Sequence, residues 1–425
     1  MAYKTNSGQA LVVALAFTAL LAGASLLVFN VGQTVNDKIR LQNAADAAAY
    51  SAALWEARSL NFQSYVNRAL VANEVAIAQL VSLRSWSQYM TQTLRNSATV
   101  GRWVPPAAAT LQALSRGWSV VDNGLQQGLP PAEAALSHWN LDVLSTVQVL
   151  AQQQAPIAAA DLVSEVAKVY DPRIQVGNST RLFQVANANT WETGLSTRYR
   201  HGSSHKARFS QLLMESRDGF TAKRRGDLLP GNPLLSLRKR GGTDLLGEYS
   251  WRGLDSLGLH VNYFFGSSEL PLGWGGAENR RLPMTLRGEA GGSWRDNPRS
   301  SRLADRGALV QNGYGGTPEF RDIVRPQSQQ DLRLTYSVDL LLPRAQMRLA
   351  DGPDAAPGYV GDALHALSSA ELYFRRPVSR ADGRTEYPSL FNPYWQAHLI
   401  EVARSTRAKA APLRGLTVDP YAVLP

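Results

Sequence analysis

Histidine spacing offers the clearest place for metal chemistry in this chain. His201 and His205 lie four residues apart, which is the spacing at which two imidazoles on one helical turn can bind zinc. The intervening Gly-Ser-Ser favours a loop instead of a helix. Zinc sites need three or four ligands, and the sequence offers no third ligand that goes with this pair. We therefore expect no metal site.

Motifs for nucleotide chemistry and for nucleophilic catalysis are missing from the sequence. It contains no Walker motif, no Gly-Xaa-Gly-Xaa-Xaa-Gly loop and no Gly-Xaa-Ser-Xaa-Gly elbow. It also contains no cysteine, which excludes disulfides, thiolate catalysis and thiolate metal sites. We expect a protein with no catalytic residues and no cofactor, and hence not an enzyme.

The elements that would position any site begin with an apolar run. Residues 10–29 carry no charge, and about 20 apolar residues in a helix are enough to cross a bilayer. The run is longer than the apolar core of a cleaved secretory signal, and no small-residue cleavage box follows it directly. We predict a tail at 1–9 and a transmembrane helix at 10–32. A mean hydropathy of −0.22 over the 425 residues excludes a polytopic membrane protein.

The orientation of this helix depends on the charges that flank it. Lys4 and the N-terminal amine favour a cytoplasmic tail, whereas Lys38 and Arg40 favour the opposite orientation. We predict that the tail is cytoplasmic, that the protein crosses a bacterial inner membrane once, and that the bulk of the chain is periplasmic.

Small residues recur inside the apolar run at a spacing that suits helix packing. Such residues let another membrane helix approach closely, although alanine is also simply common in membrane anchors. Both interpretations stay open for Ala10, Ala14, Thr18 and Ala22, and for Gly23, which follows Ala19 by four residues.

Beyond the membrane, uncharged residues predict a long helix that continues the first one. Positions separated alternately by four and three residues are free of charge from Leu41 to Leu94, and this heptad-type pattern predicts a helical stalk over 33–100. The first part of this seam is rich in small residues, which suits close packing. We define the seam by Leu41, Ala45, Ala48 and Ala52.

Two strings in this region carry a family resemblance. Gly8-Gln9-Ala10-Leu11-Val12 precedes the apolar run, and Leu41-Gln42-Asn43-Ala44-Ala45-Asp46-Ala47-Ala48-Ala49 follows it. Over roughly residues 5 to 60 the chain resembles the N-terminal module of TadG/TadE-like proteins, which belong to the tight-adherence (Flp, type IVb) pilus-assembly systems.

This resemblance implies a structural role. The expected protein is a minor pilin-like component, anchored in the inner membrane, which works with other pilus-assembly proteins in secretion and cell adhesion. Its seam would pack against another chain of the assembly. The competing account is that helices within 106–170 fold back and cover the same face. The alternative function is a membrane-tethered periplasmic binding protein of the envelope that is unrelated to pili.

The resemblance also implies a processing site and a metal motif to look for. Prepilin peptidase cuts after a glycine that is followed by glutamate at the fifth mature position, and Gly8-Gln9 is the candidate bond. Val13 occupies that fifth position, so we predict that the bond is uncut or cut inefficiently. The Asp-Xaa-Ser-Xaa-Ser motif of von Willebrand A domains, which some TadG proteins carry, is missing here, so metal-dependent adhesion is not expected.

The rest of the chain predicts an α+β fold. We expect a short helical bundle over 105–172, interrupted at Pro130-Pro131, and then a head domain with an antiparallel sheet over 177–425. Alternating apolar residues predict strands at 332–340 and 257–265. Further expectations are a hairpin that pairs 245–251 through a turn at 253–255, a strand at 370–374 and a loop at 266–281.

Positive charge is concentrated in one segment. The chain has a net charge of +10, and 198–240 holds eleven lysines and arginines. This segment either binds an anionic partner in the envelope or forms solvated loops. We favour the loops because the charges do not define a single face, and we expect no nucleic-acid partner. The eleven residues are Arg198, Arg200, Lys206, Arg208, Arg217, Lys223, Arg224, Arg225, Arg238, Lys239 and Arg240.

Overall fold

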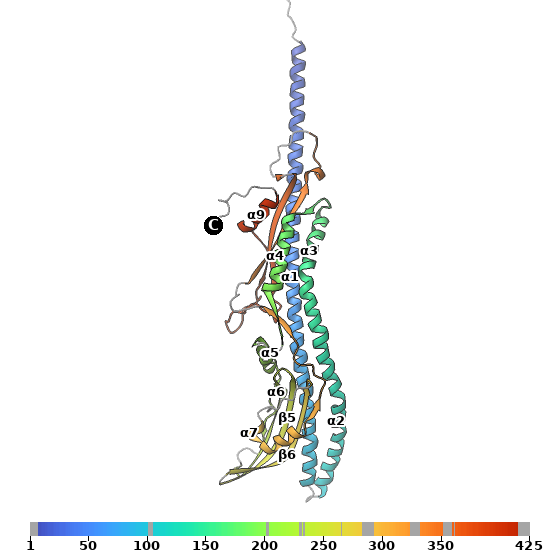
Figure 1. The fold of residues 1–425 in the computed structure, drawn as a ribbon, viewed down its shortest axis with the longest axis vertical. Helices are drawn as coiled ribbons and strands as arrows, with labels where there is room; N and C mark the ends of the chain where they lie inside the picture. The colour runs from blue at the N-terminus through green and yellow to red at the C-terminus, as the bar shows by residue number, and fades with distance from the viewer. Residues whose placement is uncertain are drawn as a thin grey trace, which may run out of the picture. The chain divides into compact units, whose positions relative to one another are not determined.

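The protein consists of helices and antiparallel sheets, which confirms the predicted α+β class. The computed structural model (Figure 1) describes residues 7–100, 105–200, 204–228, 232, 234–264, 266–282, 293–323, 332–351, 359–360 and 362–414.

One helix, α1, extends from Ser7 to Val100 and joins the predicted membrane helix to the predicted stalk. At 1.5 Å per residue, its 94 residues span about 140 Å. Two more long helices follow, with a turn of π-helix, η2, between them. Their bounds are Pro105–His138 for α2, Trp139–Leu144 for η2 and Ser145–Tyr170 for α3.

The expected break at Pro130-Pro131 is wrong, because both prolines lie inside α2. Two prolines remove two backbone donors from a helix and normally end it. Here, side chains on both sides of the pair bind the same residue of α1. Arg84 donates to Gln126 (3.1 Å) and to Glu133 (3.2 Å), and this tertiary contact holds the helix together across the prolines.

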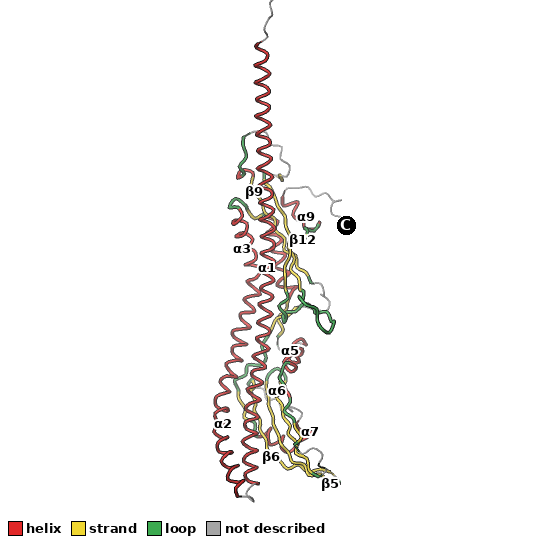
Figure 2. The backbone as a smooth tube through the Cα atoms, turned by 180° about the vertical axis from the view of Figure 1, so that it is seen from behind, coloured by secondary structure: helices red, strands yellow, loops and turns green. Residues whose placement is uncertain are grey.

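The chain divides into two compact units that do not follow the expected division into stalk, bundle and head. Unit 1 consists of residues 1–64, 150–197 and 323–425, and unit 2 consists of 65–149 and 198–322. Each unit therefore contains part of α1. The physical reason is that α1 packs against the sheet of each unit. Figure 2 shows α1 running beside the strands.

A five-stranded antiparallel sheet forms the centre of unit 1. Its strands follow the order β1-β9-β11-β10, and β12 pairs with β11. The predicted strands at 332–340 and 370–374 are confirmed as parts of β9 and β11, which pair Tyr336 with Ala370. The elements are β1 Gln175–Val176, α4 Asn178–Thr190, η3 Trp191–Leu195, β9 Arg333–Pro343, η5 Arg344–Gln346, β10 Tyr359–Val360, β11 Ala363–Phe374, β12 Trp395–Ile400, α9 Arg404–Ala410 and η6 Ala411–Arg414.

Unit 2 has its own five-stranded sheet, in the order β3-β4-β5-β6-β7, in which only the β6–β7 pair is parallel. A separate pair is formed by β2 Ser196–Tyr199 and β8 Phe320–Ile323. The other elements are α5 Ser204–Glu215, α6 Gly219–Ala222, β3 Gly226–Asp227, β4 Leu235–Leu246, β5 Ser250–Tyr263, β6 Gly266–Arg280, α7 Ser293–Asp296, α8 Pro298–Arg306 and β7 Leu309–Gln311.

Two expectations about unit 2 are wrong. The hairpin turn lies at Gly247, whose φ of +62° suits glycine, and residues 253–255 lie in the middle of β5. The expected loop at 266–281 is the strand β6, which pairs with β5 along its length. The predicted strand at 257–265 is confirmed as far as Tyr263, and Phe265 lies outside the described residues.

The glycines of β5 and β6 explain why these segments read as loops in the sequence. Gly253, Gly273 and Gly275 face α1, and a Cβ added there would meet the helix itself. At Gly253 it would lie 3.3 Å from the carbonyl oxygen of Val81 and 3.1 Å from Cβ of Ser85. Glycine weakens an isolated strand but permits close backbone approach. The sheet of unit 2 therefore packs directly on the backbone of α1.

Candidate functional site

The apolar run at the start of α1 is exposed. The most apolar part of α1 has none of its residues buried, and α1 is the one helix in the described chain that is long and apolar enough to cross a membrane. This finding fits a single-pass membrane anchor. The exposed side chains are Leu11, Val12, Val13, Leu15, Phe17, Leu20, Leu21, Leu26, Val28 and Phe29.

The small residues of the anchor are not covered by the described chain. Ala10, Ala14, Thr18 and Ala22 are exposed, and a Cβ added at Gly23 would meet nothing within 4 Å. The Thr18 hydroxyl donates to the carbonyl oxygen of Ala14 at 2.8 Å, inside the helix. Packing of another membrane helix on these residues stays a prediction. The expectation that the Gly8-Gln9 bond is uncut or cut inefficiently also stays a prediction. The backbone of both residues is helical, and their side chains lie outside the described residues.

Asn30 marks the point where the chain begins to cover α1. Its side chain is buried and makes two hydrogen bonds with the backbone of Ala350: Nδ2 donates at 3.0 Å and Oδ1 accepts at 2.8 Å. Lys38 donates to the carbonyl oxygen of His365 further along. These contacts lie within unit 1 and set Phe29 as the last residue of the uncovered apolar run.

A cluster of two carboxylates and two arginines follows directly. Arg173 binds Asp171 (2.7 Å) and Asp37 (3.1 Å), and Arg40 binds Asp171 at 3.3 Å. Hydrogen bonds from Arg173 hold the pKa of Asp171 well below its usual range, so the carboxylate stays charged. Arg40, which favoured the opposite membrane orientation in the sequence, is thus neutralised by an internal partner.

The seam is buried within unit 1. Leu41, Ala45, Ala48 and Ala52 are 0% exposed and belong to one apolar cluster. Residues of α3, β9 and β11 complete it, among them Ala159, Val163, Ala167, Val338, Leu340, Leu364 and Ala366. The expectation that another chain covers this face is therefore corrected in favour of the fold-back account. Small side chains do permit close approach here, but the neighbour is intramolecular.

A larger side chain on the seam tests this assignment. Ala48→Leu would add three carbons to a filled core and is expected to lower the free energy of unfolding by about 1–3 kcal/mol. Limited proteolysis of the protein expressed without other pilus components should show faster cleavage of unit 1. Asn43→Leu, on the exposed side of the same helix, is the matched control and should leave the cleavage rate unchanged. Equal rates for both variants would contradict the fold-back account.

Glu56 is a second buried group of unit 1. Its carboxylate is 1% exposed and accepts a hydrogen bond from the Asn187 side chain. Burial raises the pKa of Glu56 to about 8, although the bond from Asn187 acts against the shift. Glu56 is therefore protonated in the folded protein at neutral pH.

This raised pKa predicts a pH-dependent stability with a definite sign. The folded pKa of about 8 exceeds the ordinary value of 4.5, so the stabilisation is complete below about pH 4.5 and is lost as pH rises to about 8. Glu56→Gln removes this loss, and its stability advantage over the wild type should grow by at most about 1.4 kcal/mol per pH unit across that range. Thermal unfolding at pH 5, 7 and 9 measures it. A pH-independent difference would show that Glu56 is already charged.

Unit 2 contains a buried polar network around Glu74 of α1. Its carboxylate accepts hydrogen bonds from Asn140 (3.0 Å), Trp251 (3.0 Å) and Tyr314 (2.6 Å). Burial and the adjacent Glu74 raise the pKa of Tyr314 well above its usual range, so its hydroxyl stays a donor. Asn140 lies in η2, and π-helical turns often reposition a functional side chain. Here the donors belong to the core, so the network joins α1, η2 and the sheet.

Part of the basic segment 198–240 is paired inside unit 2. Five of its eleven cations bind carboxylates: Arg198 with Glu319, Arg217 with Asp244, Arg224 and Lys239 with Asp255, and Arg240 with Asp227 and Asp296. The side chains of His205 and Lys206 and all of His201 lie outside the described residues. Within the described chain no cluster of three histidine, aspartate or glutamate side chains is placed to hold a metal ion.

Sequence reasoning missed Asn30, Glu56, Glu74 and Asp255, which hold α1 or the sheets in place. A usable signal exists for Asp255, since it stands within the apolar strand sequence Gly253-Leu254-Asp255-Ser256-Leu257, where an unpaired charge would be costly. The other three lie in a helix that is covered on several sides, so their burial could not be read from the polar residue alone.

Together these features define a class: an α+β protein with one membrane-type helix that continues into the core of its folded part. Residues 8–56 match the family described as "Putative Flp pilus-assembly TadE/G-like". The match covers the exposed anchor and the whole seam, and it confirms the TadG/TadE resemblance for this segment. The chain matched no curated protein and no solved structure.

Proposed function

We propose that this protein is a structural, minor pilin-like component of Flp pilus assembly, anchored in the inner membrane with its folded part in the periplasm. The observation that carries the proposal is the coincidence of the family match at 8–56 with an exposed apolar helix. The role requires no catalytic residue.

Contacts with other assembly components belong, in this proposal, to the anchor. The seam is filled by the chain's own residues, whereas the small residues from Ala10 to Gly23 have no neighbour among the described residues that covers them. In a bilayer, small side chains allow close helix packing, which is the means by which single-span proteins associate.

Deletion of the gene tests the role, because loss of surface filaments and adherence is expected. Complementation should restore filaments with the wild type but not with Ala14→Leu/Ala22→Leu, which fills the small-residue face of the anchor without altering the folded part. Leu15→Ile/Leu26→Ile is the matched control for changes within the apolar run. Normal piliation after deletion would contradict the proposal and favour the tethered binding protein of the envelope.

Topology is tested separately by a reporter fused after Pro425. Alkaline phosphatase, which is active only outside the cytoplasm, should be active in this fusion. A fusion active only with a cytoplasmic reporter would contradict the orientation and leave the single span unaffected.

A further inference from the structure

The β5–β6 hairpin of unit 2 ends in exposed apolar side chains. Asn96, near the end of α1, donates to the carbonyl oxygen of Leu272 at 2.9 Å, and from there β5 continues to Tyr263 and β6 begins at Gly266. The apolar side chains on this part are exposed by 44% at Val261, 58% at Tyr263, 95% at Phe264 and 52% at Leu270.

The opposite face of the hairpin is covered, so its two ionisable groups are used internally. His260 bonds Asn297 at 2.9 Å, and Glu269 accepts from the backbone amides of Arg299 (2.6 Å) and Ser300 (2.9 Å) at the start of α8. They are the only ionisable acidic or basic side chains from Leu257 to Gly275 other than the Tyr263 phenol. The uncovered face thus presents Leu259, Val261, Tyr263 and Leu270 without a charge.

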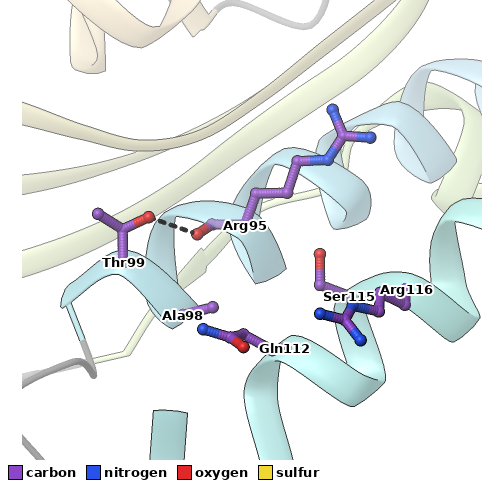
Figure 3. Close-up of a pocket in the computed structure, with 6 residues that line it drawn as sticks. All are labelled: Arg95, Ala98, Thr99, Gln112, Ser115 and Arg116. Carbon is purple, nitrogen blue, oxygen red and sulfur yellow. Dashed lines mark hydrogen bonds between the residues drawn. The ribbon is translucent and has the colours of Figure 1, made fainter. Parts of the chain in front are cut away.

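Two arginines lie at the same end of unit 2. Arg95 on α1 and Arg116 on α2 line a cavity of about 260 Å³, together with Gln112 and Ser115 (Figure 3). No ion pair within the described part of the chain involves either guanidinium. Arg95 adjoins Asn96, which bonds β6, and the end of α1 and the hairpin lie at the same end of this unit (Figure 1).

An apolar tip and two cations that form no ion pair among the described residues lie at the same end of unit 2, and this combination matches the chemistry of one partner in particular. A bilayer interface accepts aromatic and aliphatic side chains, and its head-group phosphates attract arginine. The hairpin projects its side chains outward instead of forming a groove, so it suits insertion into a soft surface better than capture of a peptide. We propose that this end of unit 2 binds an anionic lipid surface through Val261, Tyr263, Phe264 and Leu270, with Arg95 and Arg116 at the phosphates.

The test uses the full chain in nanodiscs of zwitterionic lipid, so that the apolar anchor already lies in a bilayer and does not itself bind the added vesicles. Fluorescent vesicles of phosphatidylcholine with half phosphatidylglycerol are added at low salt, and co-flotation of the nanodiscs is measured. The wild type should float with these vesicles and not with pure phosphatidylcholine. Tyr263→Ser/Phe264→Ser should weaken binding at least about tenfold. Arg95→Gln and Arg116→Gln should each weaken it about fivefold.

Val169→Ser/Val378→Ser is the matched control, because it removes two side chains that are 84% and 72% exposed in unit 1. It should float like the wild type, and circular dichroism should show every variant folded. Failure of the wild type to float, or flotation of the tip variant at the wild-type level, would overturn the proposal. So would a tip variant that loses self-association in the absence of vesicles, since that identifies a second copy as the partner. None of these outcomes depends on pilus formation.

Discussion

Gly275→Ala is expected to disrupt unit 2. A Cβ at this position would lie 2.2 Å from the carbonyl oxygen of Ser85, 2.4 Å from the amide nitrogen of Tyr89 and 2.9 Å from its Cα. All three atoms belong to the backbone of α1, so no side-chain rotation relieves the overlap. The sheet must separate from the helix, and we expect the free energy of unfolding to fall by about 3 kcal/mol or more.

Chemical denaturation followed by tryptophan fluorescence measures this loss, because Trp251 is buried in unit 2. Gly226→Ala is the matched control: Gly226 also lies in a strand of that sheet, and an added Cβ would meet nothing within 4 Å. The control should unfold like the wild type. Equal midpoints for Gly275→Ala and the wild type would show that the sheet does not pack on α1 as described.

Asp255→Ala is expected to cost about 3–5 kcal/mol of stability, because it leaves two buried cations without their counter-charge. The Asp255 carboxylate is fully buried. It accepts from Nε and Nη2 of Arg224 at 2.8 and 2.9 Å, from Nζ of Lys239 at 2.5 Å and from Ser85 at 2.7 Å. Burial alone would raise the pKa of Asp255, but Arg224 and Lys239 overcome this and hold it below its usual value.

The lowered pKa of Asp255 determines how the stability lost in Asp255→Ala should depend on pH. The carboxylate contributes stability above its unfolded pKa, which is about 3.9, and loses it as pH falls through the folded value. The gap between wild type and variant should therefore be full at pH 7 and shrink in acid. Asp382→Ala is the matched control, because it breaks the exposed pair with Arg380 at 2.8 Å and should cause no measurable change. A gap that widened in acid would contradict the assignment.

The parts of the fold that sequence could predict are those set by local periodicity. The uncharged run and the heptad-type spacing of α1 depend on residues a few positions apart, and the alternation in β9 does as well. The strand β6 could not be predicted, because Gly273, Gly275 and Gly276 read as a loop in the sequence. Their close neighbours are distant in the chain: α1 at Gly273 and Gly275, and Ala304 and Ala308 at Gly276. Pro130 and Pro131 likewise stay helical through a contact with Arg84, 46 and 47 positions away in the sequence.

The seam likewise shows that local sequence patterns do not identify contacts with distant parts of the chain. Its small residues correctly indicate a neighbour at close distance, but spacing alone does not identify that neighbour. Ala159 and Val163 of α3 complete the cluster, and so does Leu340 of β9, some three hundred residues beyond Leu41. Contacts at such separation leave no signature in the seam itself, so the choice between another chain and the same chain needed the structure.

The order of chain segments has a consequence during synthesis. Unit 2 is complete when residue 322 has been made, whereas unit 1 needs residues 323 to 414, since β9, β11 and β12 cover its part of α1. Domains fold in the order in which they are completed. Unit 2 can therefore fold while the alanines from Ala44 to Ala53 still lack their sheet. During that interval this segment exposes an apolar helix next to the membrane anchor, which makes it the part of the nascent protein most in need of a chaperone.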